Sequence, residues 1–486
     1  WRQIMNYSVV IYILGWIMEI EAAFLALPGI VSAIYGEKGG FAFLWVALGS
    51  AVAGSAIILR KPKNMRFYLR EGFVTVALSW ILMSVIGCLP FVINGDIPHF
   101  ADALFEMISG FTTTGATVVS DVEGLTKGSL FWRSFSHWIG GMGVLVFLLA
   151  IVPMAGGSHM NLMKAESPGP SVGKLVPKVR QTAKYLYIIY FALTMIEVIF
   201  LLFGGMNLFE ALTTSFGTAG TGGFAIWNDG FVSVSPYNQW VVTIFMLLFG
   251  VNFGFYFLIL TGKLRDALKF EEVRIYFIIV IAAAVFIFIN LRHFALYAPA
   301  EGIRQAFFQV ASIITTTGFA SADFNLWPET SRTILVLLMF IGACAGSTGG
   351  GIKVSRFIIA CKSFIKEIIS YLHPRSVKKI KIEGKPLEHE TLRATNVYFM
   401  TYMVIFAVSV LLVSIENKDL VTNFAAVAAT FNNIGPGLSL VGPMANFGHF
   451  TDFTKYILMF DMLAGRLEIF PMMLLFCPAV WKRRRA

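Results

Sequence analysis

Four short segments of this 486-residue sequence share one pattern that could coordinate a cation. In each segment a bulky apolar residue is followed by three residues, small or polar except for Ile434 of the fourth segment, and then by glycine. The segments are residues 111–115, 216–220, 314–318 and 431–435, and their glycines lie 105, 98 and 117 residues apart. Glycine tolerates positive φ angles, which lets successive backbone carbonyls turn toward the same side. Thr and Gly side chains are also too small to block an axis lined by those carbonyls.

The apolar runs around each segment indicate how it is positioned. A short and mostly apolar run of helical length precedes every segment, and much longer apolar runs lie before and after it. Each unit is therefore predicted to contain a long helix, a short helix, an extended segment and a second long helix. Repetition at similar spacing is a property of the whole architecture. We predict four pseudo-repeats arranged around one central pore.

Four facing segments of this kind would present rings of backbone carbonyls, which can replace the water around a potassium ion. The short helices would direct their partially negative C-termini toward the same point, which favours a cation there. Thr and Gly could instead simply allow membrane helices to pack closely, but four copies in equivalent positions favour the pore. The predicted potassium-binding filter comprises Thr112, Thr113, Thr114, Gly115, Thr218, Ala219, Gly220, Thr221, Thr316, Thr317, Gly318, Phe319, Asn432, Asn433, Ile434, Gly435 and Pro436.

The composition indicates an all-α integral membrane protein. Hydrophobic residues make up 57% of the chain and charged residues 14%, whereas soluble domains have about 25% charged residues. A membrane-spanning helix needs about 20 apolar residues. Ten runs satisfy this length and predict ten spanning helices, at roughly 8–31, 40–59, 72–93, 134–155, 185–205, 238–261, 275–296, 333–361, 395–415 and 455–480.

The order of runs and segments predicts five parts. Residues 1–66 contain two spans without a glycine-ended segment and are expected to form an accessory hairpin. The pore repeats are expected at 67–160, 161–264 and 265–368, followed by a cytoplasmic linker and the fourth repeat at 369–486.

The net charge of +10 does not require a nucleic-acid partner. Most Lys and Arg residues fall in alternate loops, on the side that also holds both termini, as the positive-inside rule expects for cytoplasmic loops. Acidic residues gather on the opposite side near the repeated segments, where they would concentrate cations. The four cysteines show no paired spacing, so neither disulfides nor a zinc site is expected. No nucleophile and base converge, so we predict no enzyme activity and no cofactor apart from the transported potassium.

A glycine-rich stretch interrupts the predicted span at 333–361. It comprises Gly346, Ser347, Thr348, Gly349, Gly350, Gly351 and Lys353. Glycine costs about 1 kcal/mol relative to alanine inside a helix, so the sequence predicts a break. A phosphate-binding loop is disfavoured because Ile352 separates glycine from Lys353 and no strand precedes it. Close helix packing is a second interpretation. We favour a third, an unwound segment beneath the filter that lines a water-filled cavity and acts as a gate.

Arg466 lies in the middle of the last predicted span, where an unpaired charge is costly. It must therefore face Asp461, Glu468, the glycine-rich stretch or pore water. An ion pair within its own helix would be purely structural. Our preferred interpretation is a cation just below the filter that sets a barrier to ion flow.

These features together resemble the Trk/Ktr/HKT superfamily of potassium transporters, and most closely its bacterial TrkH branch. The resemblance rests on the four segments, the two-helix leader, residues 166–170, the glycine-rich stretch and the Gly-Arg-Leu-Glu of residues 465–468. It implies a homodimer with one pore per chain, potassium uptake across the bacterial inner membrane, and a cytoplasmic ring of nucleotide-binding regulatory subunits. It also implies filter glycines at Gly115, Gly220, Gly318 and Gly435, a gating loop at 346–353, and a gating role for Arg466.

The fourth segment departs from the others because Asn432 and Asn433 replace threonines. We therefore expect potassium and rubidium to be preferred over sodium with weaker discrimination than in tetrameric potassium channels. The main hypothesis is a gated, channel-like conduit for potassium. The alternative is a symporter that couples potassium to protons or sodium, for which the candidate residues are Glu19, Glu21, Asp461 and Glu468.

Overall fold

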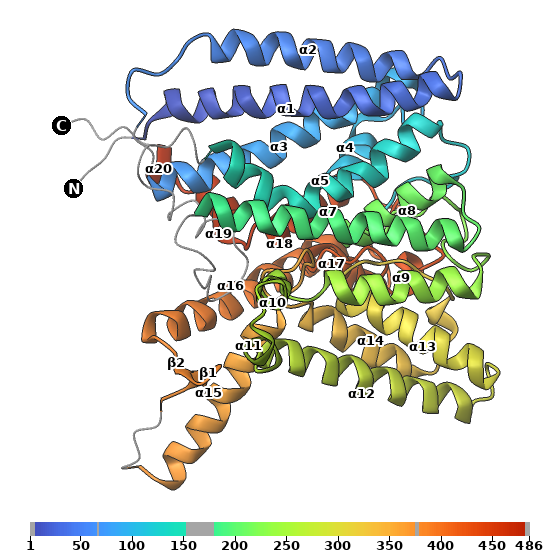
Figure 1. Cartoon of the computed structure of the whole chain (residues 1–486), viewed down its shortest axis with the longest axis vertical. Helices are drawn as coiled ribbons and strands as arrows, with labels where there is room; N and C mark the ends of the chain where they lie inside the picture. The colour runs from blue at the N-terminus through green and yellow to red at the C-terminus, as the bar shows by residue number, and fades with distance from the viewer. Residues whose placement is uncertain (1–4, 66–67, 152–178, 375–378, 482–486) are drawn as a thin grey trace.

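The accessory hairpin forms from the first two apolar runs. In the computed structural model, which describes residues 5–65, 68–151, 179–374 and 379–481, these runs are α1 (Tyr7–Ile34) and α2 (Gly40–Ile58). The two helices lie side by side at one edge of the molecule (Figure 1). Gly15 and Gly54 allow the close approach, since a Cβ atom added to Gly54 would lie 2.9 Å from the Gly15 carbonyl oxygen. Both helices of the hairpin pack against the first pore repeat, α1 on α3 and α5 and α2 on α3.

Each of the four repeats contains the predicted short helix between longer helical elements. The short pore helices are α4 (Phe100–Phe111), α8 (Leu208–Gly220), α13 (Pro299–Ile314) and α17 (Leu420–Phe431). The helices that precede them are α3 (Leu69–Asn94), α7 (Val179–Phe203), α12 (Glu271–His293) and α16 (His389–Val413). The elements that follow them are α5 (Lys127–Ile151), α9 (Pro236–Phe249) with α10 (Phe253–Leu260), α14 (Glu329–Ile341) with α15 (Val354–Leu372), and α18 (Asp452–Arg466) with α19 (Phe470–Leu475).

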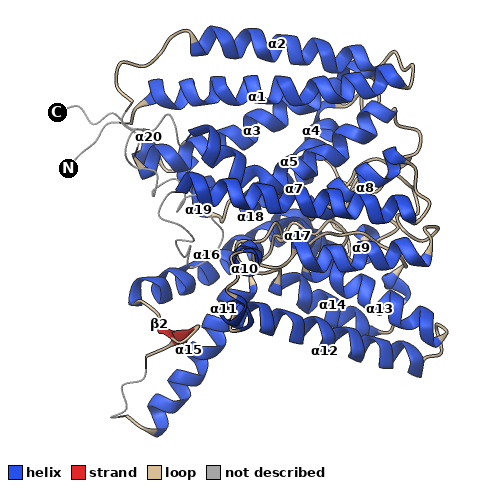
Figure 2. Cartoon of the chain, in the orientation of Figure 1, coloured by secondary structure: helices blue, strands red, loops and turns tan. Residues whose placement is uncertain are grey.

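The remaining described elements are short. They are α11 (Leu264–Leu268), α20 (Pro478–Trp481), the 3-10 turns η1 (Phe324–Leu326), η2 (Ser414–Glu416) and η3 (Ser439–Val441), and the strands β1 (Lys381–Ile382) and β2 (Lys385–Pro386). The strands pair antiparallel, with Ile382 opposite Lys385. Helices dominate the described chain, and the small hairpin lies between α15 and α16 (Figure 2). The fold is therefore all-α apart from this hairpin.

Six described helices are long and apolar enough to cross a membrane: α1, α2, α3, α7, α12 and α16. A seventh span arises if α9 and α10, which meet at an angle of 88°, are taken together. The other three predicted spans correspond to α5 and to the interrupted pairs α14/α15 and α18/α19. The interruptions in α14/α15 and α18/α19 follow from their sequences. The five glycines within residues 342–351 disfavour a continuous helix in the first pair, and Pro471 does so in the second.

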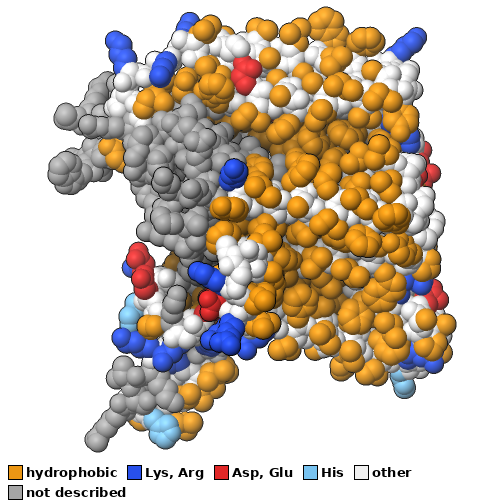
Figure 3. Space-filling view, in the orientation of Figure 1, with side chains coloured by type: hydrophobic (Ala, Val, Ile, Leu, Met, Phe, Trp, Pro, Cys, Tyr) orange, Lys and Arg blue, Asp and Glu red, His pale blue; other side chains and the backbone are white. Residues whose placement is uncertain are grey.

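The outer surface of the bundle suits a bilayer. Large apolar side chains such as Phe41, Trp45, Phe203, Ile278 and Leu411 are exposed. In Figure 3 hydrophobic side chains cover the broad face of the bundle, while charged side chains gather mainly toward its two opposite edges. Exposed apolar area on this scale requires a lipid environment rather than water.

The first and last described helical elements meet on one side of the bundle. The Tyr7 hydroxyl donates a hydrogen bond of 2.9 Å to the Trp481 carbonyl oxygen. All four cysteines are free thiols. Residues 166–170, which contributed to the family resemblance, lie outside the described residues.

Candidate functional site

The four pore helices end in the same backbone conformation. In each case the first or second residue past the helix adopts a left-handed conformation. The N–H of the residue after it donates to the carbonyl five residues earlier, which is a Schellman termination. The left-handed residues are Thr113 (φ 54°), Thr221 (φ 54°), Thr316 (φ 60°) and Asn433 (φ 55°). The corresponding hydrogen bonds are Thr114 to Ser109, Gly222 to Gly217, Thr317 to Ser312 and Ile434 to Ala429, of 2.8–2.9 Å. This agreement gives the structural alignment of the four repeats.

The structural alignment changes which residues of the second repeat correspond to the filter segments of the other three. Glycine with positive φ lies two positions after the left-handed residue in every repeat, at Gly115, Gly223, Gly318 and Gly435. The equivalence drawn from sequence between Gly220 and the other three glycines was therefore wrong by three residues. Thr218, Ala219 and Gly220 form the last turn of α8 instead. Gly220 serves helix packing, because a Cβ atom there would lie 2.2 Å from the His137 carbonyl oxygen.

The four loops meet in a ring. A Cβ atom added to Gly115 would lie 2.0 Å from the Gly222 carbonyl oxygen. A Cβ atom added to Gly223 would lie 2.0 Å from the Thr317 carbonyl oxygen. One added to Gly318 would lie 1.9 Å from the Ile434 carbonyl oxygen, and one added to Gly435 would lie 2.7 Å from the Thr114 carbonyl oxygen. The glycine of each repeat thus contacts a carbonyl of the next repeat. The glycine of the fourth repeat contacts a carbonyl of the first, which completes the ring.

The carbonyls of this ring are suited to a cation. Thr114, Gly222, Thr317 and Ile434 each lie one residue before the glycine of their repeat. Within the described parts of the chain, no hydrogen bond reaches their carbonyl oxygens. Buried carbonyls normally have partners, so four orphaned oxygens around one axis form an arrangement that a desolvated cation can satisfy. The C-termini of four pore helices face the same region and add negative potential.

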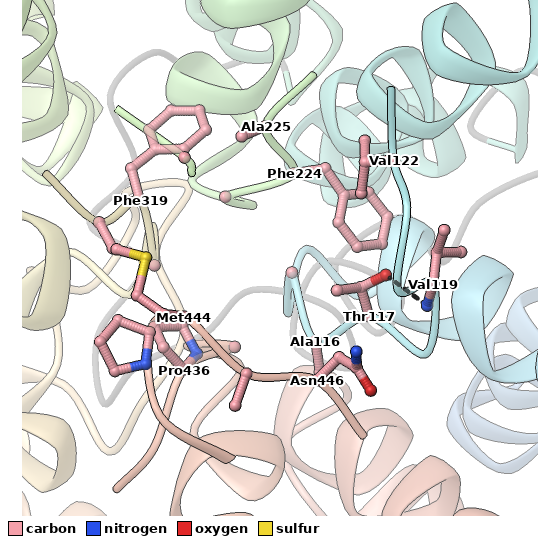
Figure 4. Close-up of a pocket in the computed structure, with 18 of the residues that line it drawn as sticks. Ala116, Thr117, Val119, Val122, Phe224, Ala225, Phe319, Pro436, Met444 and Asn446 are labelled. Atoms are coloured by element: carbon pink, nitrogen blue, oxygen red, sulfur yellow. Dashed lines mark hydrogen bonds between the residues drawn. The ribbon is translucent and has the colours of Figure 1, made fainter. Parts of the chain in front are cut away.

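A cavity opens on one side of the ring. Its lining includes the residue after each glycine: Ala116, Phe224, Phe319 and Pro436. Figure 4 shows these four residues around the opening, one from each repeat. Met444 and Asn446 of the fourth repeat complete its edge. An ion arriving from this side therefore meets all four repeats together.

The interrupted helix of the third repeat lies against the loops that form the ring, at residues that precede the ring carbonyls. Residues 342–353 separate α14 from α15, so the predicted break is present. The Gly350 N–H donates to the Thr316 hydroxyl at 2.6 Å, and a Cβ atom on Gly350 would lie 2.6 Å from the Asn432 carbonyl oxygen. The buried Lys353 amino group donates to the Gly349 carbonyl. We call residues 342–353 the intramembrane loop.

Arg466 joins the intramembrane loop to the first repeat. Its guanidinium donates to the Thr348 carbonyl and to the Gly140 carbonyl of α5, both at 2.8 Å. Gly140 in turn touches the end of the first pore helix, since a Cβ atom there would lie 1.9 Å from the Phe111 carbonyl oxygen. Of the partners expected from sequence, the glycine-rich stretch is confirmed as one. Glu468 pairs with Arg356 instead, and Asp461 accepts a hydrogen bond from Ser409 at 2.6 Å.

Glu272 is a site residue that sequence reasoning missed. One oxygen of this buried carboxylate accepts the N–H of Ala345 at 2.7 Å and that of Ser355 at 3.0 Å. It therefore holds both ends of the intramembrane loop on α12. The only signal in the sequence was a pair of acids, Glu271 and Glu272, at the start of a predicted span.

The acids proposed for ion coupling are scattered. Glu19 accepts a hydrogen bond from Ser55 at 2.6 Å, and Glu21 is buried in α1, a helix outside the four repeats. Among the described residues, one group has metal-ligand geometry and lies near the surface: His99, Asp102 and Asp452. The Lys455 amino group is 2.5 Å from Asp102 there, and a second cation beside it would be repelled.

Comparisons with known proteins agree with this architecture. The family model described as a cation transport protein, TrkH, matches residues 41–483. The Trk system potassium uptake protein TrkH of Escherichia coli K12 is 36% identical over 98% of this chain and all of its own length. TrkG of the same organism is 31% identical over 98% of this chain and 99% of its own length. The solved structure of the potassium transporter TrkH from Vibrio parahaemolyticus has a TM-score of 0.88 at 33% identity and covers 98% of this chain and 100% of its own. This chain therefore belongs to the TrkH family of cation transport proteins.

Proposed function

We propose that this chain forms a potassium uptake pore in the bacterial inner membrane, with both termini cytoplasmic. The observation that carries the proposal is the ring of orphaned carbonyls at Thr114, Gly222, Thr317 and Ile434. The names of the relatives, which describe potassium uptake proteins of a Trk system, support the choice of ion. In this proposal the filter residues are those predicted for the first, third and fourth repeats, with Thr221, Gly222 and Gly223 in the second.

The driving force in this proposal is the membrane potential. It contributes about 2.3 kcal/mol per elementary charge for each 100 mV, which is enough to draw potassium inward without a coupled ion. Backbone carbonyls from four different sequences form the ring, and the fourth repeat contributes Asn432 and Asn433 where the others have Thr or Gly. Rubidium is expected to pass almost as well as potassium, and sodium less well.

The intramembrane loop and Arg466 are proposed to close the inner side of the filter. Support comes from their position, since the loop touches the third and fourth filter loops and Arg466 connects it to the first repeat. Movement of the loop away from Thr316 and Asn432 would open a path from the ring to the inner side. The contacts at Glu272 give the loop fixed ends about which such a movement can occur.

Reversal potentials in proteoliposomes test the proposal against symport. The purified chain is expected to give a zero-current voltage that follows the potassium gradient alone. A voltage that also follows the proton or sodium gradient would support the symporter, and the buried Asp461 would then be the first residue to substitute. Absence of any potassium current or rubidium flux, from protein that elutes as a folded species, would contradict both hypotheses.

Partners are proposed on the basis of the family and of one surface. We propose a homodimer with one pore per chain and a cytoplasmic ring of nucleotide-binding regulatory subunits, because the relatives belong to a named Trk system. The end of α15 extends beyond the bundle (Figure 1) and leads to the hairpin that carries Lys381 and Lys385. Crosslinking from Lys381 to a co-expressed regulatory subunit would test this surface, and labelling of lipid alone would contradict it.

A further inference from the structure

Three of the four filter loops are braced by side chains of the loops themselves. In the first repeat the hydroxyls of Thr112 and Thr114 are 2.8 Å apart, and in the third those of Thr315 and Thr317 are 2.7 Å apart. In the fourth, the Asn433 amide donates to the Thr114 hydroxyl at 2.9 Å. These hydrogen bonds hold the ring carbonyls in place from within.

The second repeat lacks such a hydrogen bond between side chains, since the Thr221 hydroxyl donates to the adjacent Gly220 carbonyl at 2.6 Å. Its residues at the positions of the two threonines are Gly220 and Gly222, which carry no side chain. Two glycines beside the ring would leave the loop free to adopt several conformations. The structure nevertheless holds it in the same backbone conformation as the other three, with φ of 54° at Thr221 and 83° at Gly223.

His137 of α5 occupies the place of the missing side chains. A Cβ atom added to Gly222 would lie 2.1 Å from the Cγ atom of the His137 ring. The ring is fully buried and packs on Phe224 at a centroid distance of 4.3 Å. Its Nδ1 atom is 2.7 Å from the Gly110 carbonyl oxygen, and its Nε2 atom is 3.2 Å from the Phe224 backbone nitrogen. Because the backbone N–H can only donate, Nε2 accepts and Nδ1 carries the proton. His137 thereby links the first pore helix to the second filter loop.

Arg133 lies one helical turn earlier on α5 and holds the outer end of the same loop. Its guanidinium is 4.2 Å above the Phe224 ring and donates to the Ala225 carbonyl at 3.3 Å. The Arg133 Nε atom donates to Glu106 at 2.8 Å, and both side chains are buried.

Glu106 connects Arg133 to the filter loop of the first repeat. Its carboxylate accepts hydrogen bonds from the Thr117 hydroxyl at 2.9 Å and from the Val118 N–H at 3.0 Å, two and three residues after Gly115. Figure 4 shows Phe224 beside Thr117 where the first and second repeats meet. The buried pair of Glu106 and Arg133 therefore joins the exits of two neighbouring filter loops.

We propose that His137 and Arg133 are positioning residues that hold the second filter loop in its ion-binding conformation, and that they set the discrimination between potassium and sodium. The proposal rests on the potassium-conducting function proposed above. Loss of either contact releases the Gly222 carbonyl, so that the ring can contract around the smaller sodium ion. The pore remains open to cations, but its selectivity falls.

Substitutions at His137 test the proposal through the ratio of rubidium to sodium flux in proteoliposomes. In His137→Asn the amide can still donate to Gly110 but no longer reaches Phe224, whereas in His137→Gln an oxygen can reach the Phe224 N–H. We expect the ratio to fall about fivefold in His137→Asn, since one hydrogen bond contributes about 1 kcal/mol. His137→Gln is expected to retain most of the wild-type ratio. Ser134→Ala is the matched control, because Ser134 is buried on the same helix and its hydroxyl has no partner among the described residues.

Arg133 requires a paired substitution, because removing it alone leaves Glu106 as an uncompensated buried charge. The double variant Glu106→Gln with Arg133→Met avoids that charge and is expected to lower the ratio at least as much as His137→Asn. Wild-type ratios in both His137→Asn and the double variant, with rubidium flux intact, would overturn the proposal, as would equal losses in His137→Asn and His137→Gln. If wild type and Ser134→Ala themselves show no preference for rubidium, the proposed potassium function fails instead.

Discussion

Replacement of Arg466 gives the sharpest test of the proposed gate. The guanidinium makes two hydrogen bonds of 2.8 Å, one to the intramembrane loop at Thr348 and one to α5 at Gly140. Hydrogen bonds from a charged group contribute about 1.5–3 kcal/mol each. The lower value for both gives about 3 kcal/mol, which corresponds to about 100-fold in the equilibrium between a held and a released loop. We expect Arg466→Ala to raise rubidium influx into proteoliposomes by up to about this factor.

Arg466→Lys separates the two roles that a cation could have here. Lysine keeps the charge but lacks the planar fork that reaches two carbonyls at once. If the hydrogen bonds hold the loop, Arg466→Lys will conduct at a level between wild type and Arg466→Ala. If charge alone forms the barrier, Arg466→Lys will behave like wild type. Arg332→Ala, which removes a partly exposed arginine paired with Glu329 on α14, is the control. Wild-type influx through folded Arg466→Ala protein would refute the reasoning.

Two further substitutions and one deletion test the ring and the intramembrane loop. Gly318→Ala places a Cβ atom 1.9 Å from the Ile434 carbonyl oxygen at a φ of 83°, so rubidium uptake per folded protein should fall at least about tenfold, and normal uptake would exclude a close-packed ring. Deletion of residues 346–351 should raise the passive rubidium leak, whereas an unchanged leak would show that the loop is not an obstacle. Glu272→Ala leaves two backbone N–H groups of the loop ends without an acceptor, at about 1–3 kcal/mol each. Its thermal unfolding temperature should therefore be lower than that of a Glu271→Ala control; equal temperatures would argue against the anchor.

The positions of the pore helices were predictable because their signals are local. Asn207 caps the start of α8 in a reciprocal contact with Glu210, and the Asp419 side chain caps the start of α17. The break before α15 was predictable for the same reason, since five glycines between 342 and 351 make a continuous helix costly.

The partners of charged residues were not predictable to the same degree. Arg466 had four candidate partners by sequence, and its choice of Thr348 and Gly140 depends on α5 and α18 meeting beneath the first pore helix. Glu272 accepts hydrogen bonds from the backbone N–H groups of residues 345 and 355. Because every residue type except proline has such a group, the sequence does not show which residues are its partners. Contacts between segments so far apart along the chain exist only once the repeats have packed.

The sequence by itself determined that this chain is a helical membrane protein with four glycine-ended segments, because apolar length and glycine content act within each segment. Only the tertiary structure decided which residues of the second segment join the ring. Thr218, Ala219 and Gly220 match the pattern in the sequence, yet they complete α8, and the turn comes at Thr221. The physical reason is that the space around this loop is filled by His137 of the first repeat. A left-handed turn is placed where neighbouring elements leave room for it, and that room is a property of the packed molecule.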